Sequence, residues 1–411
     1  MNILFISTWD CVGGAALSAW KLGLFLRRRG HDVKFIVGNK LSADKHVYMY
    51  PRDRKLANLS AALKCDLTGL RTAVCANDID FGIGDEIMCH PWFQRANVVH
   101  CQNLHGGYFK LTTLKSISLH KPTIWTLHDE WAVMPHGAWA TSERSRSGFF
   151  ERDTLSTYPP MLWDNSRYLK RKKQEIYNEL SCTIVTPSRW LATIVQHSVL
   201  DTQSIRVIHN GVETSKFHPS DKTRSRTFLS LPLNKKIILL VANAGNRNSQ
   251  KGWNMIDSIA ARCSRHANDI QFICVGGGPR DTALSQGVVQ YIPYIQDQAV
   301  LTKYYAAADA LLFPSLHENF PLVILEAQAC GLPVVSFDVG GVKEAVVHKK
   351  TGYIAKYMDI HDLVAGLEYI IGLSGHAYTL MALRATKNMR QNFSQEKMGA
   401  SYERLYAKLI K

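Results

Sequence analysis

The segment FPSLHENFPLVILEAQACGLPVVSFDVGGVKEAV, residues 313–346, decides the fold of this chain. The apolar run ADALLF that leads into it predicts a buried strand, and VVSF predicts a second one. Between them, PLVILEAQAC predicts a helix that begins at Pro321, a position where a missing N–H costs nothing, and GLP ends it. The GG pair predicts a turn before another helix. This alternation is typical of a parallel α/β sheet.

The start of this helix is a candidate anion site. First-turn N–H groups, those of Leu322, Val323 and Ile324, have no partner inside the helix, and with the helix dipole they favour a diphosphate. Glu318 lies in the loop before the helix and Glu326 lies inside it, so the two carboxylates approach one ligand from different sides. Taken alone, the pair is equally consistent with solvated surface charges. The apolar neighbours of Glu326 in VILEAQAC favour a side chain that points into a cleft.

The segment ENFPLVILEA resembles the Glu-x7-Glu motif of the retaining glycosyltransferases of family 4, which have the GT-B fold, and GLPVVSFDVGGVKEAV is similar to the same family. The resemblance is strongest over residues 237–352. It implies that Glu318 faces the donor sugar and that Glu326 binds the ribose hydroxyls. Pro321 stands where members often have Gly, and it removes one amide from the phosphate cradle. The resemblance also implies donor contacts at Phe320, Pro321, Leu322 and Val323.

The N-terminal segment predicts the opening of a Rossmann-like domain. A strand, NILFIS, is followed by a glycine loop, an amphipathic helix and a second strand, DVKFIV. Gly13 and Gly14 lack the GxGxxG spacing, so we predict no nicotinamide or flavin cofactor. The two glycines serve either a tight turn or, as the resemblance implies, a donor-binding loop, and both roles stay open.

Polar residues follow two further predicted strands, NVVHC and PTIWT. Gln102, Asn103 and His105 follow the first, and His128 and Asp129 follow the second. Ligands bind at the carboxyl ends of strands in such sheets, although a lone His is more often structural. The segment TLHDEW also resembles an exopolysaccharide or colanic-acid-type subgroup of the same family, which implies that His128 approaches the donor sugar. No metal-ligand spacing surrounds these residues.

A loop with two cations, AGNRNSQKGW, follows the first strand of the second half. Arg247 and Lys251 suit a diphosphate, although surface Lys and Arg are common. The resembling family has Gly-Arg followed by Lys-Gly here, and Lys251 with Gly252 matches the second pair. The family's Arg falls on Asn246, so the sequence leaves open whether Arg247 replaces it.

Length and composition bound the architecture. The 411 residues suffice for two domains, which we place at 1–215, joined by a C-terminal helix at 394–411, and at 216–393. No apolar run approaches the ~20 residues that span a bilayer, and the N-terminus predicts a strand rather than a signal peptide. Nine Cys are dispersed without a CxxC pair, which favours a reducing compartment and a cytoplasmic location.

The chain is basic, with a formal net charge of +15. Basic runs at 27–29, 52–55 and 167–173 indicate either solvated faces or a contact with an anionic membrane surface or a phosphorylated acceptor. No nucleic-acid module is recognisable, so nucleic acid is not an expected partner. A peripheral contact at the inner face of a membrane is therefore the expectation.

Together these features predict two Rossmann-like α/β domains that face a cleft, the GT-B fold, with the last helix crossing back to the first domain. We expect a retaining, metal-independent hexosyltransferase that moves a sugar from a nucleotide diphosphate sugar to a polysaccharide or lipid-linked oligosaccharide, in bacterial-type exopolysaccharide or lipopolysaccharide biosynthesis. The predicted catalytic residues are His128, Lys251 and Glu318. The alternatives are a GT-B sugar-nucleotide 2-epimerase and a non-catalytic partner protein that keeps the fold. The sequence does not specify the sugar, the nucleoside or the acceptor.

Overall fold

The chain forms two compact units in the computed structural model, which describes residues 1–50, 67–139, 161–242, 249–264, 269–277 and 289–411. One unit comprises Met1–His209 with Met398–Lys411, and the other comprises Asn210–Lys397. The first unit therefore ends a few residues before the predicted boundary at 215, and the C-terminal segment joins it from Met398 rather than from residue 394.

The first unit is built on a seven-stranded sheet in the order β3-β2-β1-β4-β5-β6-β7, in which every pair is parallel. Strands β4, β5 and β6 are buried at every position, as expected for parallel strands covered on both faces, and besides apolar residues they contain threonines and His100. The strands are β1 Asn2–Trp9, β2 Asp32–Asn39, β3 Val47–Met49, β4 Val98–Cys101, β5 Thr123–Thr126, β6 Thr183–Thr186 and β7 Ser204–Val207.

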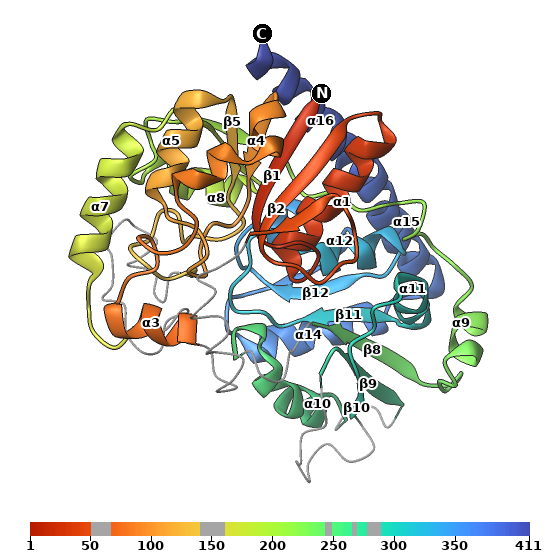
Figure 1. Cartoon of the computed structure of the whole chain (residues 1–411). Helices are drawn as coiled ribbons and strands as arrows, with labels where there is room; N and C mark the ends of the chain where they lie inside the picture. The colour runs from red at the N-terminus through yellow and green to blue at the C-terminus, as the bar shows by residue number, and fades with distance from the viewer. Residues whose placement is uncertain (51–66, 140–160, 243–248, 265–268, 278–288) are drawn as a thin grey trace. The chain divides into compact units, whose positions relative to one another are not determined.

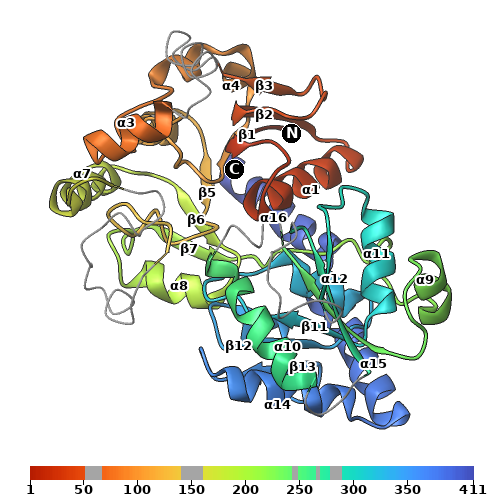
Figure 2. The same cartoon turned by 90° about the horizontal axis from the view of Figure 1, so that it is seen from below.

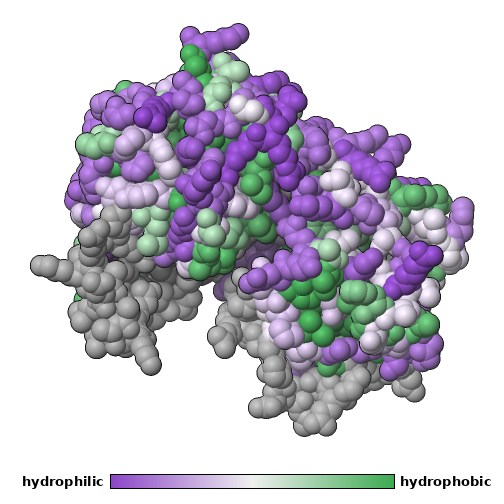
Figure 3. All heavy atoms as spheres, turned by 45° about the vertical axis from the view of Figure 1, so that its right-hand side comes forward, coloured by the Kyte–Doolittle hydropathy of each residue, from purple (hydrophilic) through white to green (hydrophobic). Residues whose placement is uncertain are grey.

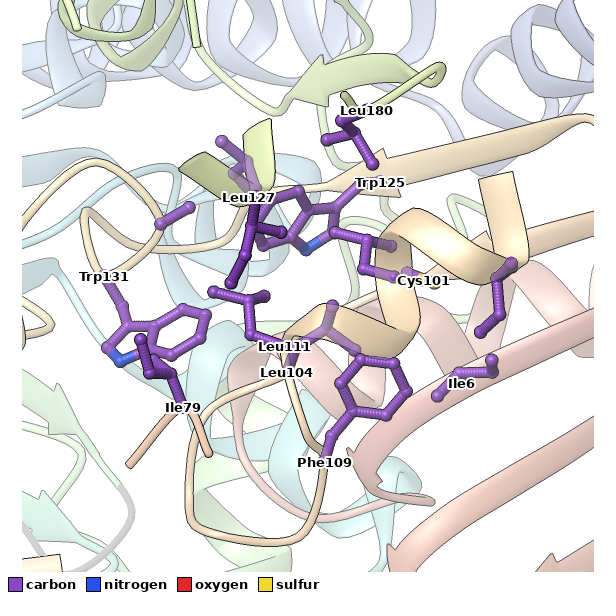
Figure 4. Packing of buried hydrophobic residues seen from close by; sticks show 14 of the residues in the cluster. Ile6, Ile79, Cys101, Leu104, Phe109, Leu111, Trp125, Leu127, Trp131 and Leu180 are labelled. Atoms are coloured by element: carbon purple, nitrogen blue, oxygen red, sulfur yellow. The ribbon is translucent and has the colours of Figure 1, made fainter. Parts of the chain in front are cut away.

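Helices connect these strands, and a large apolar core packs against one side of the sheet (Figure 4). This core contains Trp125 of β5 and Leu127, which directly follows that strand. They lie among Cys101, Leu104 and Leu180. The helices are α1 Gly14–Arg28, α3 Leu67–Cys75, the 3-10 helix η1 Asp85–Cys89, α4 Pro91–Arg95, α5 Thr112–His120, α7 Ser166–Asn178 and α8 Arg189–Gln196. The predicted N-cap at Ser188 is confirmed, because its Oγ accepts a hydrogen bond of 3.0 Å from the N–H of Leu191.

The C-terminal helix α16, Gln395–Ile410, returns to the first unit, as predicted (Figure 1). Its residues Met398, Tyr402 and Tyr406 are buried in one core with Phe5 and Phe35 of β1 and β2. A Cβ at Gly399 would overlap the ring of Phe25 on α1, so a larger residue at position 399 would force this ring to move. The helix is thus an integral part of the first unit.

The second unit contains a six-stranded parallel sheet in the order β10-β9-β8-β11-β12-β13. Its strands are β8 Lys236–Val241, β9 Ile270–Val275, β10 Val289–Ile292, β11 Ala310–Phe313, β12 Val334–Phe337 and β13 Gly352–Ala355. Its helices are α9 Lys222–Phe228, the 3-10 helices η3 Ser249–Lys251 and η4 Trp253–Met255, α10 Ile256–Ser264, α11 Gln298–Ala307, α12 Leu322–Ala329, α13 Val342–Ala345, α14 Ile360–Ile371 and α15 Gly375–Asn392. Helices α9 and α11 lie side by side, and α11 contacts the interior strand β8 (Figures 1 and 2).

A buried ion pair fastens α9 to this sheet. Arg226 is 5% exposed, and its Nη2 lies 2.7 Å from Oδ2 of Asp309, just before β11. The same carboxylate oxygen accepts a hydrogen bond of 2.7 Å from the N–H of Ile237 in β8. Nε of Arg226 donates a second hydrogen bond to the carbonyl of Ala307. Both charges are therefore paired and hydrogen-bonded, which is the condition under which burial of a charge is tolerated.

The face of the molecule in Figure 3 is mostly hydrophilic, with scattered apolar groups. Within the described ranges, no helix has both the length and the apolar composition needed to cross a membrane.

Candidate active site

Residues 310–329 form β11, a loop and α12, and the loop lies at the carboxyl ends of the strands of the second sheet. The strand ends at Phe313, and the helix begins at Leu322 rather than at Pro321. Pro321 is the N-cap, because its ψ of 127° is extended and not helical. The helix therefore begins one residue later than predicted, and the N–H groups of Leu322, Val323 and Ile324 still belong to its first turn.

Two of the predicted catalytic residues pair with each other in the second unit. Nζ of Lys251 lies 2.6 Å from Oε1 of Glu318, and Oγ of Ser315 donates to the same oxygen at 2.8 Å. The side chain of Glu318 is 10% exposed and that of Lys251 is 28% exposed. The pair is therefore partly shielded from water yet still accessible to a ligand.

Glycines allow three loops to meet at this point. Gly252 has a φ of 69°, and a Cβ there would overlap the carbonyl oxygen of Pro314. Gly340 has a φ of 54°, and a Cβ there would overlap the carbonyl oxygen of Glu318. The N–H of Gly341 also donates 2.8 Å to the carbonyl of Asn319. The glycines of the Lys-Gly and Gly-Gly pairs thus hold the loop that carries Glu318.

Glu326 is buried, at 6% exposure, inside α12. Its Oε2 accepts a hydrogen bond of 3.1 Å from the hydroxyl of Tyr305 on α11. Burial and the nearby Glu326 carboxylate raise the pKa of Tyr305 well above its usual value, so the phenol remains a donor. Tyr305 therefore fixes one carboxylate oxygen of the residue predicted to bind ribose.

Phe320 is an interior side chain. It is 4% exposed, and its ring lies 5.4 Å from that of Phe393. Its carbonyl accepts 2.9 Å from Nδ2 of the buried Asn210. A donor contact at Phe320 would therefore involve its backbone rather than its ring. Arg247 and Asn246 lie outside the described residues, so the structure leaves the predicted phosphate arginine untested.

In the first unit, His128 follows β5 and is held by a residue that follows β4. Its Nε2 lies 2.7 Å from Oε1 of Gln102, at the carboxyl ends of adjacent strands as expected. Burial lowers the pKa of His128 to about 4, although the nearby Asp129 acts in the opposite direction. The imidazole is consequently neutral near pH 7.

The carboxylate of Asp129 makes hydrogen bonds with three neighbouring residues. Its Oδ2 accepts from His105 Nε2 at 2.9 Å and from Asn103 Nδ2 at 3.1 Å, and its Oδ1 accepts from the N–H of Trp131 at 3.1 Å. Burial alone would raise the pKa of Asp129, but His105 opposes this and the net direction is down. Burial would lower the pKa of His105, but Asp129 raises it overall. The hydrogen bonds that converge on Asp129 hold the loop after His128 in place.

Gly13 and Gly14 lie at the start of α1, after β1. Gly13 has a φ of 85°, which requires glycine, whereas no positive φ applies to Gly14. A Cβ at either position would meet no atom within 4 Å. Steric packing within the unit therefore does not explain a glycine at position 14.

Sequence reasoning missed several residues that shape these sites. Tyr305 and Ser315 contact the two glutamates but have no motif of their own. Lys173, counted in an exposed basic run, is 1% exposed, donates 2.8 Å to the carbonyl of Met134 and lies 3.9 Å from the ring centre of Trp131. The sequence pattern could have predicted that Lys173 is buried, because it lies at helical spacing from Leu169, Ile176 and Tyr177, which form the buried face of α7.

Comparisons with known proteins identify the class. The family model Glycosyltransferase Family 4 matches residues 12–216, and the model Glycosyl transferases group 1 matches residues 235–372. The chain belongs to these family 4, group 1 glycosyltransferases, and its two parallel-sheet units have the Rossmann-like architecture of the GT-B fold.

Individual relatives agree with this class. The D-inositol 3-phosphate glycosyltransferase of Mycolicibacterium paratuberculosis (strain ATCC BAA-968 / K-10) is 26% identical over 411 residues, with 95% of this chain and 86% of that protein covered. HepE from Anabaena, solved in complex with UDP, superimposes with a TM-score of 0.69 at 17% identity, covering 99% of this chain and 100% of that chain. WaaG, a glycosyltransferase involved in lipopolysaccharide biosynthesis, gives a TM-score of 0.66 at 15% identity and covers 98% of each chain.

Proposed function

We propose that this glycosyltransferase transfers a sugar, with retention of anomeric configuration, from a nucleotide diphosphate sugar to a polysaccharide or lipid-linked oligosaccharide. The observation that carries the proposal is the Lys251–Glu318 pair in the loops beside the start of α12, with Glu326 buried inside the same helix. A cation, helix amides and two carboxylates are the groups needed for a diphosphate and two sets of sugar hydroxyls.

Each residue has a defined part in this proposal. Lys251 exchanges its partner Glu318 for the donor diphosphate and neutralises the charge that grows on it as the glycosidic bond breaks. Glu318, released from Lys251, accepts hydrogen bonds from the transferred sugar, and Glu326 accepts them from the ribose diol. Catalysis then rests on electrostatic preorganisation around the leaving diphosphate.

His128 contributes a neutral imidazole to the donor sugar. Because its pKa is lowered to about 4, it adds no positive charge near the sugar ring, where positive charge develops during transfer. Gly13 and Gly14 are assigned to the donor-binding loop that the family resemblance implies, and Gly13 adopts the positive φ of 85° that glycine permits. Both roles extend the family resemblance to the described geometry.

Retention is proposed to occur by attack on the face from which the diphosphate leaves, with a leaving phosphate oxygen accepting the acceptor's proton. Lys251 and the α12 amides supply positive charge to the diphosphate, so we propose that turnover needs no divalent metal. Turnover that survives EDTA supports this, and a strict Mg²⁺ or Mn²⁺ requirement would contradict it.

The donor and the pathway are inferred from neighbours. HepE has been solved with UDP and with UDP-glucose, which makes a uridine diphosphate sugar the first donor to test. The chain also shares its fold with WaaG, a glycosyltransferase involved in lipopolysaccharide biosynthesis. We therefore propose a surface glycan as the product class. The exopolysaccharide or colanic-acid-type subgroup indicated by TLHDEW belongs to the same proposal.

A panel of nucleotide sugars tests this function. A true donor at about 100 times its dissociation constant should stabilise the protein by ~2.7 kcal/mol, seen as a rise in Tm. Nucleoside diphosphate should then be released in quantity only when a glycan acceptor is added. Conversion of the donor to its 2-epimer without acceptor would favour the epimerase alternative, and a protein that binds no nucleotide sugar would favour the non-catalytic one.

We also propose a peripheral contact with an anionic membrane through one face of the first unit. Leu70 and Val74 on α3 are exposed, as are Leu162 and Trp163, and Nε1 of Trp163 donates 2.9 Å to the carbonyl of Val74. The exposed residues Arg167, Lys170 and Arg171 on α7 follow directly. Apolar residues beside basic ones suit the interface of an anionic leaflet.

Co-sedimentation with anionic liposomes at low salt tests the membrane contact. Trp163→Ser should weaken it, whereas Leu233→Ser, which removes an exposed apolar side chain from the second unit, should not. No binding by the parent protein, or equal binding by the Trp163 variant, would refute this contact.

A further inference from the structure

A chain of buried hydrogen bonds joins His128 to the C-terminal helix. His128 Nε2 is 2.7 Å from Oε1 of Gln102, whose Nε2 is 2.9 Å from Nε2 of His100. Nδ1 of His100 is 2.8 Å from the hydroxyl of Tyr406 on α16. His100 and Tyr406 are 0% exposed and Gln102 is 1% exposed, so the two bonds that His100 makes to them are shielded from water, whereas His128 is half-buried.

With the Gln102 amide oriented as in this structure, the chain of hydrogen bonds has one polarity. The amide nitrogen of Gln102 can only donate, so Nε2 of His100 accepts and its proton lies on Nδ1, where it is donated to Tyr406. The amide oxygen can only accept, so His128 carries its proton on Nε2. His128 therefore has an unprotonated Nδ1, which can accept a hydrogen bond from a sugar hydroxyl.

Neighbouring groups fix the members of the chain. The ring of Tyr402, also on α16, lies 5.1 Å from that of His100, and its hydroxyl is 3.0 Å from Oγ1 of Thr126. Thr126 Oγ1 in turn lies 2.7 Å from Nε2 of His100. Burial lowers the pKa of His100 well below its usual value, which keeps this ring neutral and its two nitrogens distinct.

We propose that the hydroxyl of Tyr406 sets the tautomer of His128 through His100 and Gln102, so that α16 positions the donor-facing histidine. Without that hydroxyl, the Nδ1 proton of His100 has lost its acceptor in the interior. The ring then gains by moving its proton to Nε2, which requires the Gln102 amide to turn over and present its nitrogen to His128. His128 must now accept at Nε2 and carry its proton on Nδ1, which is the wrong form for accepting from a hydroxyl.

This inference rests on the proposed role of His128 but is measured separately from it. The full-length protein, labelled with [15N]histidine, reports through long-range 1H–15N spectra which ring nitrogen carries each proton. Signals are assigned with His128→Gln and His100→Gln. In the parent we expect His128 to be protonated at Nε2. In Tyr406→Phe we expect its population to shift toward the Nδ1-protonated form.

The kinetic readout follows the same variants. Tyr406→Phe should lower turnover about tenfold and change the KM for donor by less than about twofold, the split expected when a group that orients a catalytic residue is lost. Tyr177→Phe is the matched control: its buried hydroxyl donates 3.0 Å to the carbonyl of Ala132, outside the chain. It should leave the His128 tautomer and turnover unchanged. Should Tyr406→Phe fail to fold, Gln102→Leu cuts the same chain and must show the same loss of the Nε2-protonated form.

The possible failures are distinguishable. A parent protein with His128 protonated at Nδ1, or a Tyr406→Phe variant with parental spectra and turnover, overturns the positioning chain. Equal kinetic losses in Tyr177→Phe overturn it as well, because they would show a general effect of losing a buried hydroxyl. If His128→Ala retains full turnover, the proposed function of His128 fails and with it the catalytic role of α16, whatever the tautomer spectra show.

Discussion

Replacement of Lys251 by alanine probes the pair at the start of α12. In the free protein this substitution removes the cation 2.6 Å from Glu318, whose remaining side-chain hydrogen bond among the described residues comes from Ser315. In the reaction it removes the proposed partner of the leaving diphosphate. Because the charge on the diphosphate grows as the glycosidic bond breaks, the loss should be greater in the transition state than in the ground state.

The expected loss of turnover is estimated from the exposure of Lys251. Two unit charges about 4 Å apart near a protein surface interact by about 4 kcal/mol at an effective dielectric constant near 20. Lys251 is 28% exposed, and screening by water reduces this to roughly 2–3 kcal/mol. Turnover should therefore fall roughly 30- to 150-fold, with a smaller change in the KM for donor.

Steady-state release of nucleoside diphosphate measures both constants. Lys222→Ala is the matched control, because it removes a lysine that pairs with Asp309 at 3.0 Å elsewhere in the second unit. The control should keep parental turnover. A Lys251→Ala effect confined to KM, or a comparable loss in Lys222→Ala, would refute the assignment.

Three further outcomes are expected. His128→Ala should lower turnover roughly 10²-fold without loss of fold, as measured by kinetics and circular dichroism; parental turnover would return His128 to a structural role. Arg226→Met leaves Asp309 buried without its main partner, so urea titration should show a loss of about 3–5 kcal/mol; a loss below 1 kcal/mol would contradict the tight pairing. The free energy of unfolding should fall as the pH is lowered from about 6.5 to about 4, since the unfolded state there binds a proton that folded His128 does not. His128→Gln should flatten that slope by up to ~1.4 kcal/mol per pH unit in urea titrations, and an unaltered slope would show that the folded pKa is not lowered.

Sequence patterns predicted much of the fold because strands, helix ends and turns depend mainly on neighbouring residues. The strand, helix and strand from β11 to β12 follow from apolar runs interrupted by Pro and Gly, and Ser188 caps α8 as its residue type suggests. The start of α12 was misplaced by one residue, because a proline satisfies both the N-cap and the first helical position. Only its ψ of 127° decides between them.

Contacts between distant residues could not be predicted in this way. His100 and Tyr406 are 306 positions apart, and no spacing rule joins a strand residue to the last helix. The bond from Tyr305 on α11 to Glu326 on α12 likewise joins two separate helices. The sequence supplied the charged groups of the site, whereas the side chains that orient them depend on tertiary packing.

Calorimetric titration of nucleoside diphosphate, with UDP first, tests the central claim most directly. Hydrogen bonds to a charged group contribute about 1.5–3 kcal/mol each, so Glu326→Ala should weaken nucleotide binding by roughly 10- to 100-fold. Tyr305→Phe, which leaves the carboxylate in place, serves as the control for the broken 3.1 Å bond and should bind nearly as the parent does. Glu318→Ala should also bind the free nucleotide as the parent does, yet transfer sugar more slowly. Parental binding by Glu326→Ala, or a loss of nucleotide binding in Glu318→Ala instead, would contradict the proposed donor site.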